Sequence, residues 1–191
     1  MRNCYFLSWN VRGLRKMEKV RAVCRTIRTS KASVVFLQES KMSTLKQRVI
    51  ERLKNKILRE VAIVPSEGAS GGLISMWDSK FFVVERNMEL QRCIILVGTL
   101  SQWNLRVSLI NVYAPNSQGE RKDFLEQLAC NIDALDLPTV IGGDFNAVKE
   151  AGKMWCGNKC YFINYVCKFH KHLEVDRFAT FRGKVYLVQG W

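Results

Sequence analysis

The apolar residues of this chain gather in short runs, and four of these runs lead directly into polar residues. The runs cover residues 4–9, 34–38, 107–112 and 137–141, and they are rich in β-branched and aromatic side chains. Runs of this length, bounded by Gly, Pro or Asn, are typical of buried strands. We therefore predict a strand at each of the four, the third of them extended to 105–112, and similar patterns predict strands at 60–64, 73–77, 81–85 and 93–99.

Amide, carboxylate and phenol side chains stand where the four runs stop. Asn10, Glu39 and Tyr113 follow the first three, and the fourth leads into Gly142-Gly143-Asp144-Phe145-Asn146. If the strands lie side by side, these groups share one rim, and oxygen ligands of this kind suit a hard metal and a phosphate. The two glycines remove side chains at a point where we expect the backbone to pass close to a substrate.

Each of these polar residues also has an ordinary structural explanation. Glu39 after a strand could be a solvated loop acid, and Tyr113 could be an aromatic residue with a hydrated hydroxyl group. Asp144 and Asn146 could cap a turn or a helix, because Asp and Asn favour such positions. Only their joint occurrence at four strand ends favours a functional site.

Apolar residues at helical spacing predict four helices. The first runs from Met17 to Ile27, the second opens with a capping-box pattern at Thr44 and extends to Ile57, the third extends from Ser117 to Leu135, and the fourth covers 161–172. The chain contains no internal repeats or Pro-rich linkers, so we expect residues 1–191 to form a single domain of the α+β class.

The four motifs together resemble one known family. Read in order, 9–14 (Trp-Asn-Val-Arg-Gly-Leu), 37–40 (Leu-Gln-Glu-Ser), 111–115 (Asn-Val-Tyr-Ala-Pro) and 142–146 are similar to motifs of the endonuclease/exonuclease/phosphatase family. The closest likeness is to the endonuclease domain of plant LINE-type (non-LTR) retrotransposons. This resemblance implies a four-layer αββα sandwich of the DNase I type and a metal-dependent phosphodiesterase, a DNA endonuclease of retrotransposon origin.

The resemblance also implies a role for each residue at the strand ends. Glu39 would be the principal ligand of Mg²⁺ or Mn²⁺, with Asn10 beside it at the metal. Tyr113 would contact the scissile phosphate. Asp144 would orient or deprotonate the attacking water, and Asn146 would hold a phosphate oxygen.

The chain departs from the family near its end. Members finish with a Ser-Asp-His segment, whereas this sequence has no Asp-His dipeptide and only two histidines, His170 and His172, in the lysine-flanked stretch 168–172. We therefore expect a C-terminally truncated domain that lacks its last strands and has weak nuclease activity or none. The alternative is a degenerate, non-catalytic remnant that still binds nucleic acid.

The net charge is +13 and is concentrated near the N-terminus. Residues 1–60 contain 16 Lys and Arg against 4 Asp and Glu, whereas residues 61–191 contain 14 against 13. This asymmetry favours a polyanionic partner, DNA or RNA, and Arg12 within the first motif would contact it. The alternative is that exposed helix faces carry Lys and Arg only for solubility.

Seven cysteines occur without a secretory signal, so we expect free thiols and a nuclear or cytoplasmic protein that is not secreted. One series, Cys156, Cys160, Cys167 and His170, invites a zinc interpretation, but its spacing does not match the usual structural sites. No apolar run is long enough for a membrane span. The sequence implies no obligate protein partner.

Overall fold

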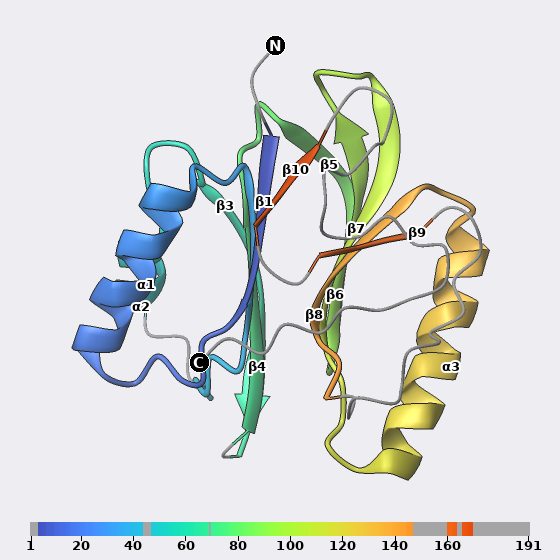
Figure 1. Ribbon diagram of the computed structural model, residues 1–191, viewed down its shortest axis with the longest axis horizontal. Coiled ribbons are helices and arrows are strands. Elements are labelled where there is room, and N and C mark those ends of the chain that lie inside the picture. Colours follow the sequence, from blue (N-terminus) through green and yellow to red (C-terminus); the bar gives the residue numbers. More distant parts are fainter. Residues whose placement is uncertain (1–3, 44–46, 69, 147–159, 164–165, 170–191) are drawn as a thin grey trace.

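The strands form two five-stranded sheets that face each other (Figure 1). The computed structural model describes residues 4–43, 47–68, 70–146, 160–163 and 166–169. The first sheet has the order β10-β1-β2-β4-β3 and the second has the order β5-β6-β7-β8-β9. The strands of the first sheet are β1 (Cys4–Asn10), β2 (Val34–Gln38), β3 (Glu60–Glu67), β4 (Ser70–Trp77) and β10 (Val166–Phe169). Those of the second are β5 (Phe82–Leu90), β6 (Cys93–Leu100), β7 (Leu105–Tyr113), β8 (Thr139–Asp144) and β9 (Cys160–Ile163).

Each sheet contains a parallel pair of strands joined by a helical crossover. In the first sheet, β1 and β2 are parallel and α1 (Met17–Ser30) connects them. In the second, β7 and β8 are parallel and α3 (Gln118–Leu135) connects them. The strands of a parallel pair end on the same edge of the sheet, so each pair delivers two chain ends to one rim.

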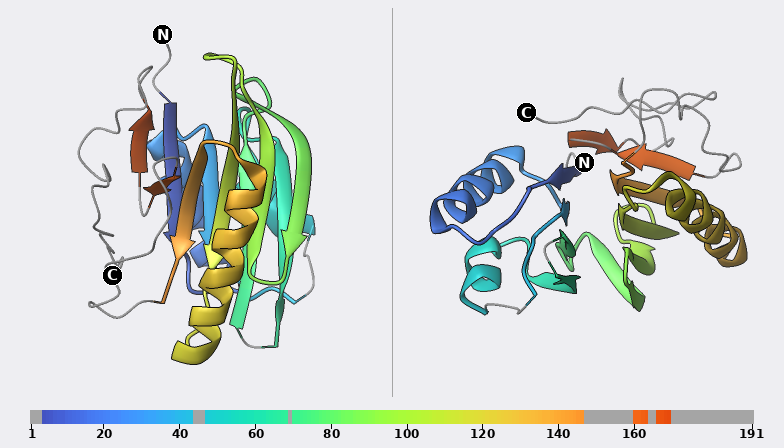
Figure 2. Two further views of the ribbon diagram at one scale, coloured as in Figure 1. Left: turned by 90° about the vertical axis from the view of Figure 1, so that its right-hand side faces the viewer. Right: turned by 90° about the horizontal axis from the view of Figure 1, so that it is seen from below.

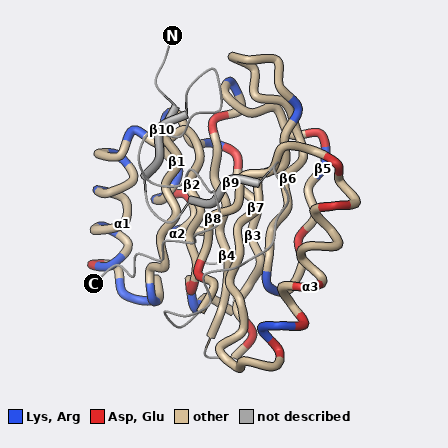
Figure 3. Tube along the Cα trace, turned by 45° about the vertical axis from the view of Figure 1, so that its right-hand side comes forward, with Lys and Arg blue, Asp and Glu red and all other residues tan. Residues whose placement is uncertain are grey.

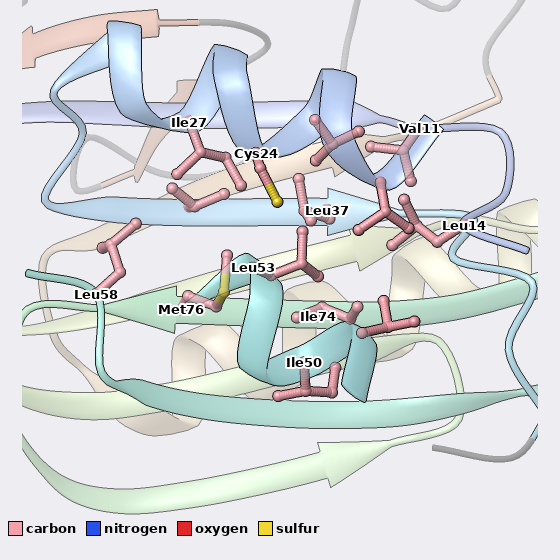
Figure 4. Packing of buried hydrophobic residues seen from close by; sticks show 14 of the residues in the cluster. Val11, Leu14, Cys24, Ile27, Leu37, Ile50, Leu53, Leu58, Ile74 and Met76 are labelled. Atoms are coloured by element: carbon pink, nitrogen blue, oxygen red, sulfur yellow. The ribbon is translucent and has the colours of Figure 1, made fainter. Parts of the chain in front are cut away.

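The helices cover the outer faces of the two sheets. Figure 2, in its right-hand view, shows α1 and α2 (Gln47–Leu53) on one side of the sandwich and α3 on the other. α1 buries Val20, Val23, Cys24 and Ile27, and α2 buries Val49, Ile50 and Leu53. Figure 4 shows side chains of both helices packed over Leu37, Ile74 and Met76 of the first sheet. The α3 helix packs on the second sheet through Leu128 and Ile132.

A separate core fills the space between the sheets. It includes Phe6 and Phe36 from the first sheet and Phe82, Leu96 and Leu109 from the second, all 1% exposed or less. The expected four-layer αββα sandwich is thereby confirmed, together with the strands predicted from the apolar runs. No helix among the described residues is long and apolar enough to cross a membrane.

Two helix predictions were wrong in part. The predicted fourth helix is replaced in its described part by β9 and β10, because Tyr, Phe, Ile and Val in this segment favour strands. The second helix ends at Leu53 and does not reach Ile57. The Asn55 side chain accepts hydrogen bonds from the backbone N–H groups of Ile57 and Leu58, at 2.7 and 2.9 Å, and forms a turn there. Thr44 of the predicted capping box lies outside the described residues.

The expectation of free thiols holds for the three cysteines whose side chains are described. Cys24 and Cys93 are buried and Cys130 is exposed, and none of the three forms a disulfide. The side chains of the Cys156, Cys160, Cys167 and His170 series lie outside the described residues, so the zinc interpretation stays a sequence argument.

Candidate active site

The predicted site residues meet where the two parallel strand pairs end. Asn10 is the last residue of β1, and Glu39 directly follows β2. On the facing sheet, Tyr113 ends β7 and stands in register with Asp144, the last residue of β8. The two sheets therefore contribute two residues each to one rim, as the positions of the strand ends predicted.

The Asn10 side chain connects the two carboxylates of the site. Its Nδ2 group donates to Glu39 Oε1 at 3.0 Å and to Asp144 Oδ2 at 2.5 Å. Because Glu39 and Asp144 belong to different sheets, this single amide group spans the gap between them. The amide oxygen of Asn10, Oδ1, accepts a hydrogen bond from the backbone N–H of Arg12 at 3.0 Å, which fixes the orientation of the amide.

Glu39 is held by three side chains. In addition to Asn10, the Tyr113 hydroxyl donates to Glu39 Oε1 at 3.2 Å, and Lys41 Nζ lies 3.1 Å from Oε2. Burial raises the pKa of the Glu39 carboxyl, but the hydrogen bonds from Asn10 and Lys41, the Lys41 charge and the Tyr113 hydrogen bond outweigh it and leave the pKa below its usual value. The carboxylate is therefore ionised at neutral pH.

The Tyr113 hydroxyl is a hydrogen-bond donor and stays protonated. Burial, followed by the negative charge and hydrogen bonding of Glu39, raises its pKa to about 12. A phenol with such a pKa can donate to a carboxylate or a phosphate oxygen at neutral pH, but it cannot act as a base there.

Asn146 and Arg12 flank the two ends of this arrangement. The backbone N–H of Asn146 donates to Asp144 Oδ1 at 2.9 Å, and its side-chain Nδ2 donates to the carbonyl of Ala114 at 2.6 Å. The Arg12 side chain is exposed beside the site. Asn146 thus contacts Asp144, and the backbone of Arg12 contacts Asn10, whereas the roles expected for these two residues stay predictions.

The backbone around the site adopts an unusual conformation. Arg12, Glu39, Lys41 and Asn146 all have positive φ angles, between 47° and 53°. Such angles are uncommon for residues other than Gly, and they cluster where surrounding structure fixes functional side chains.

A buried polar bridge behind the rim joins the two sheets. Gln38 Nε2 donates to Asn111 Oδ1 at 2.7 Å and to Ser8 Oγ at 3.3 Å, and Asn111 Nδ2 reaches the carbonyl of Ile74 at 3.2 Å. Gln38 and Asn111 are 1% and 0% exposed. Gln38 directly precedes Glu39, and Asn111 lies two residues before Tyr113 on β7, so the bridge fixes the two segments that carry these site residues.

Sequence reasoning missed this bridge and Lys41. The signal for the bridge was present, because Gln38 and Asn111 are single polar residues within otherwise apolar strands, and a buried polar group needs a partner. The role expected for the Gly142–Gly143 pair needs correction at its second residue. A Cβ atom on Gly143 would collide with the carbonyl of Val112, so this glycine leaves room for the neighbouring strand.

The ionisable groups of the site fit a divalent cation. Two carboxylates, Glu39 and Asp144, converge on one amide, and Lys41 is the only cation paired with them among the described residues. The described residues contain no cluster of three His, Cys, Asp or Glu side chains. A hard cation such as Mg²⁺ needs only one or two carboxylates, with amide oxygens and water as its other ligands.

Several solved structures have a similar fold. A truncated TDP2 of Caenorhabditis elegans is 21% identical with a TM-score of 0.55, over 78% of this chain and 64% of that chain. D. rerio TDP2 complexed with a single-strand DNA product is 19% identical with a TM-score of 0.58, over 78% and 63%. A mannosyl-6-phosphatase of Bacteroides thetaiotaomicron is 12% identical with a TM-score of 0.59, over 75% and 65%.

These likenesses concern the fold, and the chain spans two thirds or less of the length of each of these proteins. No curated protein matches the sequence significantly. The family model for the endonuclease/exonuclease/phosphatase family, however, matches residues 7–155, which include Asn10, Glu39, Tyr113, Asp144 and Asn146. The chain belongs to the endonuclease/exonuclease/phosphatase family.

Proposed function

We propose that this protein is a metal-dependent phosphodiesterase domain that cuts nucleic acid, with DNA as its substrate. The observation that carries the proposal is the contact of one amide, Asn10, with the carboxylates of Glu39 and Asp144. Carboxylates that converge on one amide suit a hard divalent cation, and Lys41 is the only cationic side chain paired with either of them among the described residues. The cation of the working site would be Mg²⁺ or Mn²⁺, held by Glu39 and by Asn10, whose amide oxygen would have to turn from the Arg12 N–H toward the metal.

Each residue of the site has a role in this proposal. When bound, a divalent cation would polarise a phosphoryl oxygen and stabilise the leaving oxygen. Asp144 orients the attacking water or accepts its proton. Tyr113 donates a hydrogen bond from its hydroxyl group to a phosphate oxygen, because its raised pKa keeps the hydroxyl protonated at neutral pH. Asn146 holds a second phosphate oxygen, and Arg12 contacts the backbone of the nucleic acid.

The positive charge of the first 60 residues supports nucleic acid over other phosphate esters. Sixteen Lys and Arg against four Asp and Glu lie in this segment, and Asn10 and Glu39 belong to it. The fold alone does not decide between substrates, because it is common to a TDP2 complexed with single-strand DNA and to a sugar phosphatase. The Trp9–Leu14 motif favours an origin in a LINE-type retrotransposon, which we include in the proposal.

We expect the activity of this chain to be weak. Its two histidines, His170 and His172, lie in a lysine-flanked stretch, and neither directly follows an Asp as the histidine of the family's closing motif does. General acid–base help of the kind histidine gives contributes typically ~10²–10⁴-fold to a rate. A degenerate domain that binds nucleic acid without cutting it is the second candidate, favoured by this same observation.

The test is a nicking assay on supercoiled plasmid with the 191-residue protein. We expect slow nicking that requires Mg²⁺ or Mn²⁺ and that is lost in Glu39→Ala and in Asp144→Ala. The matched control is Glu60→Ala, which removes an exposed carboxylate from the start of β3, far along the strand from the site. Binding of Mn²⁺, followed by electron paramagnetic resonance, should weaken in Glu39→Ala and stay unchanged in Glu60→Ala.

Two results would overturn parts of the proposal. Undiminished nicking by Glu39→Ala or Asp144→Ala would remove the assigned roles. Folded protein that binds DNA but never nicks it with either metal would leave the non-catalytic remnant as the correct function.

A further inference from the structure

Five exposed arginines lie on the outer helices of the first sheet. Arg21, Arg25 and Arg28 of α1 have the spacing i, i+4, i+7, and Arg48 and Arg52 of α2 have the spacing i, i+4. Residues at these spacings share one face of a helix. We call these five residues the arginine face, and all five are exposed.

The two helices bring their arginines together at one seam. Cys24 Sγ of α1 donates to the carbonyl of Arg52 at 3.1 Å, which places the C-terminal end of α2 against the middle of α1. Both Arg28 and Arg52 are close enough to the Cys24 thiol to act on it electrostatically. The arginine face is therefore one surface that crosses both helices. Figure 3 shows Lys and Arg along α1 and in the loop before it.

This concentration of charge is not neutralised within the described chain. None of the five arginines forms a salt bridge with a described Asp or Glu. Like charges at i, i+4 destabilise a helix, and Arg21–Arg25 and Arg48–Arg52 are two such pairs. The arrangement therefore acts against the stability of both helices, and an external anion would relieve the repulsion.

We propose that the arginine face binds the phosphate backbone of a nucleic-acid strand outside the cleavage site. Guanidinium groups pair with phosphates through two parallel hydrogen bonds, which favours arginine over lysine for this task. The α1 helix begins shortly after Asn10, and Arg12, Arg15 and Lys16 are exposed between them. A strand that leaves the site along this loop meets the arginine face next.

A nucleic acid fits this surface better than an anionic membrane does. Surface helices that bind membranes carry large apolar side chains on their buried face. Here the apolar face of α1 packs on the protein's own sheet, and Met17 is the one large apolar residue of α1 and α2 that is exposed. We take the polyanion to be nucleic acid on the strength of the proposed function.

The experiment is fluorescence anisotropy with a labelled single strand of about 30 bases and a duplex of about 30 base pairs, between roughly 50 and 200 mM NaCl. EDTA is present, so that binding is measured without cleavage. The variant carries Arg21→Gln, Arg25→Gln and Arg28→Gln. The matched control loses the same charge from exposed residues elsewhere, through Lys80→Gln, Arg86→Gln and Lys122→Gln.

We expect the α1 variant to bind at least about tenfold more weakly at about 100 mM NaCl. Its plot of log affinity against log salt should be shallower by roughly 0.7–0.9 for each phosphate that the arginines no longer neutralise. The control should keep both values close to those of the unchanged protein. Circular dichroism establishes that each variant is folded, and Arg48→Gln with Arg52→Gln gives a second test on α2.

Equal losses of affinity in the variant and the control would overturn the inference, because net charge alone would then explain binding. Binding to phosphatidylserine vesicles that depends on the arginines, without binding to either nucleic acid, would overturn it in favour of a membrane. If the protein does not nick DNA but binds it through the arginines, only the proposed cleavage activity is contradicted. If it nicks DNA and binding does not depend on the arginines, only the role of the arginine face is contradicted.

Discussion

The two halves of the sandwich share an architecture and differ in charge. α1 carries four basic residues and one acidic residue, and α2 carries two and one, whereas α3 carries two basic and four acidic residues. Figure 3 shows this contrast between the helices on opposite sides. Both halves place a parallel strand pair and its crossover helix around their half of the site.

The two halves also contribute different residues to the candidate site. The first half supplies Asn10, Glu39 and the counter-charge of Lys41, together with a basic surface outside. The second half supplies Tyr113 and Asp144. Neither half contains both carboxylates, so the site forms only while the two sheets keep their relative position. The buried hydrogen bond between Gln38 and Asn111 joins the two sheets and can hold that position.

Removing the hydrogen bond between Gln38 and Asn111 should lower the stability of the protein more than any other change considered below. Asn111→Leu leaves Gln38 Nε2 with a single, longer hydrogen bond to Ser8, and removes the partners of Asn111 in the first sheet. We expect the free energy of unfolding to fall by about 3 kcal/mol, because a buried polar group without its partner costs about 1–3 kcal/mol. Urea denaturation measures this.

A double-mutant cycle separates the bridge from the volume change. Gln38→Leu combined with Asn111→Leu should cost less than the sum of the single variants, because neither polar group is then left without its partner. The exposed Asn87→Leu is the control and should change stability by less than about 0.5 kcal/mol. Strict additivity of the two buried substitutions would show that the hydrogen bond does not couple the sheets.

The two buried cysteines, one in each half, are expected to affect stability differently at alkaline pH. Burial raises the pKa of Cys93, in the second half, from 9.0 to about 11. Burial also raises the pKa of Cys24, but the charges of Arg28 and Arg52 act against it. Below about pH 9 the Cys93 thiol is protonated in both the folded and the unfolded protein, and its contribution to stability is fully present. As the pH rises from 9.0 to about 11, the thiol ionises more readily in the unfolded protein, and this contribution is lost.

We therefore expect the free energy of unfolding to fall at alkaline pH mainly through Cys93, by roughly 2–3 kcal/mol at about pH 11. Urea denaturation between about pH 8 and 11 should show a flatter decline for Cys93→Ala, whereas Cys24→Ala should change the decline less. Tyr113, whose pKa is raised to about 12, adds to the loss only above pH 10.0, the ordinary pKa of its hydroxyl group. An unchanged decline in Cys93→Ala would contradict the burial of this thiol.

The smallest effect is expected at the start of α3. Ser117 occupies the N-cap position but makes no side-chain hydrogen bond there, and Lys16 before α1 makes none either. Ser117→Ala should therefore cost less than about 0.5 kcal/mol, below the usual cost of removing a cap. Thermal unfolding of this variant beside the unchanged protein measures it, and a loss above about 1 kcal/mol would mean that the hydroxyl caps the helix in solution.

The sequence predicted the ends of the strands better than it predicted some of the helices. Asn10, Glu39, Tyr113 and Asp144 could be placed at strand ends because these ends follow from the apolar runs, whereas their roles stay predictions. Short apolar segments such as 160–163 fit a helix or a strand equally well, and here tertiary pairing with β8 decided for a strand. The Asn55 turn ended α2 through local hydrogen bonds that apolar spacing does not reveal.

The contacts between the sheets could not be predicted. The pairing of Gln38 with Asn111 joins residues 73 positions apart, and the ion pair of Lys41 with Glu39 depends on two left-handed backbone positions. Both are consequences of the folded geometry. The sequence indicated only that a polar group inside an apolar strand needs a partner.

The left-handed backbone of Glu39 has a consequence for how this protein would respond to selection. At a φ of 53°, an L-residue other than Gly costs roughly 1–2 kcal/mol, which glycine avoids. The proposed activity requires a carboxylate at this position, whereas the backbone conformation is most favourable for glycine. A search for heat-resistant variants of this protein would therefore tend to discard the carboxylate on which its proposed activity depends.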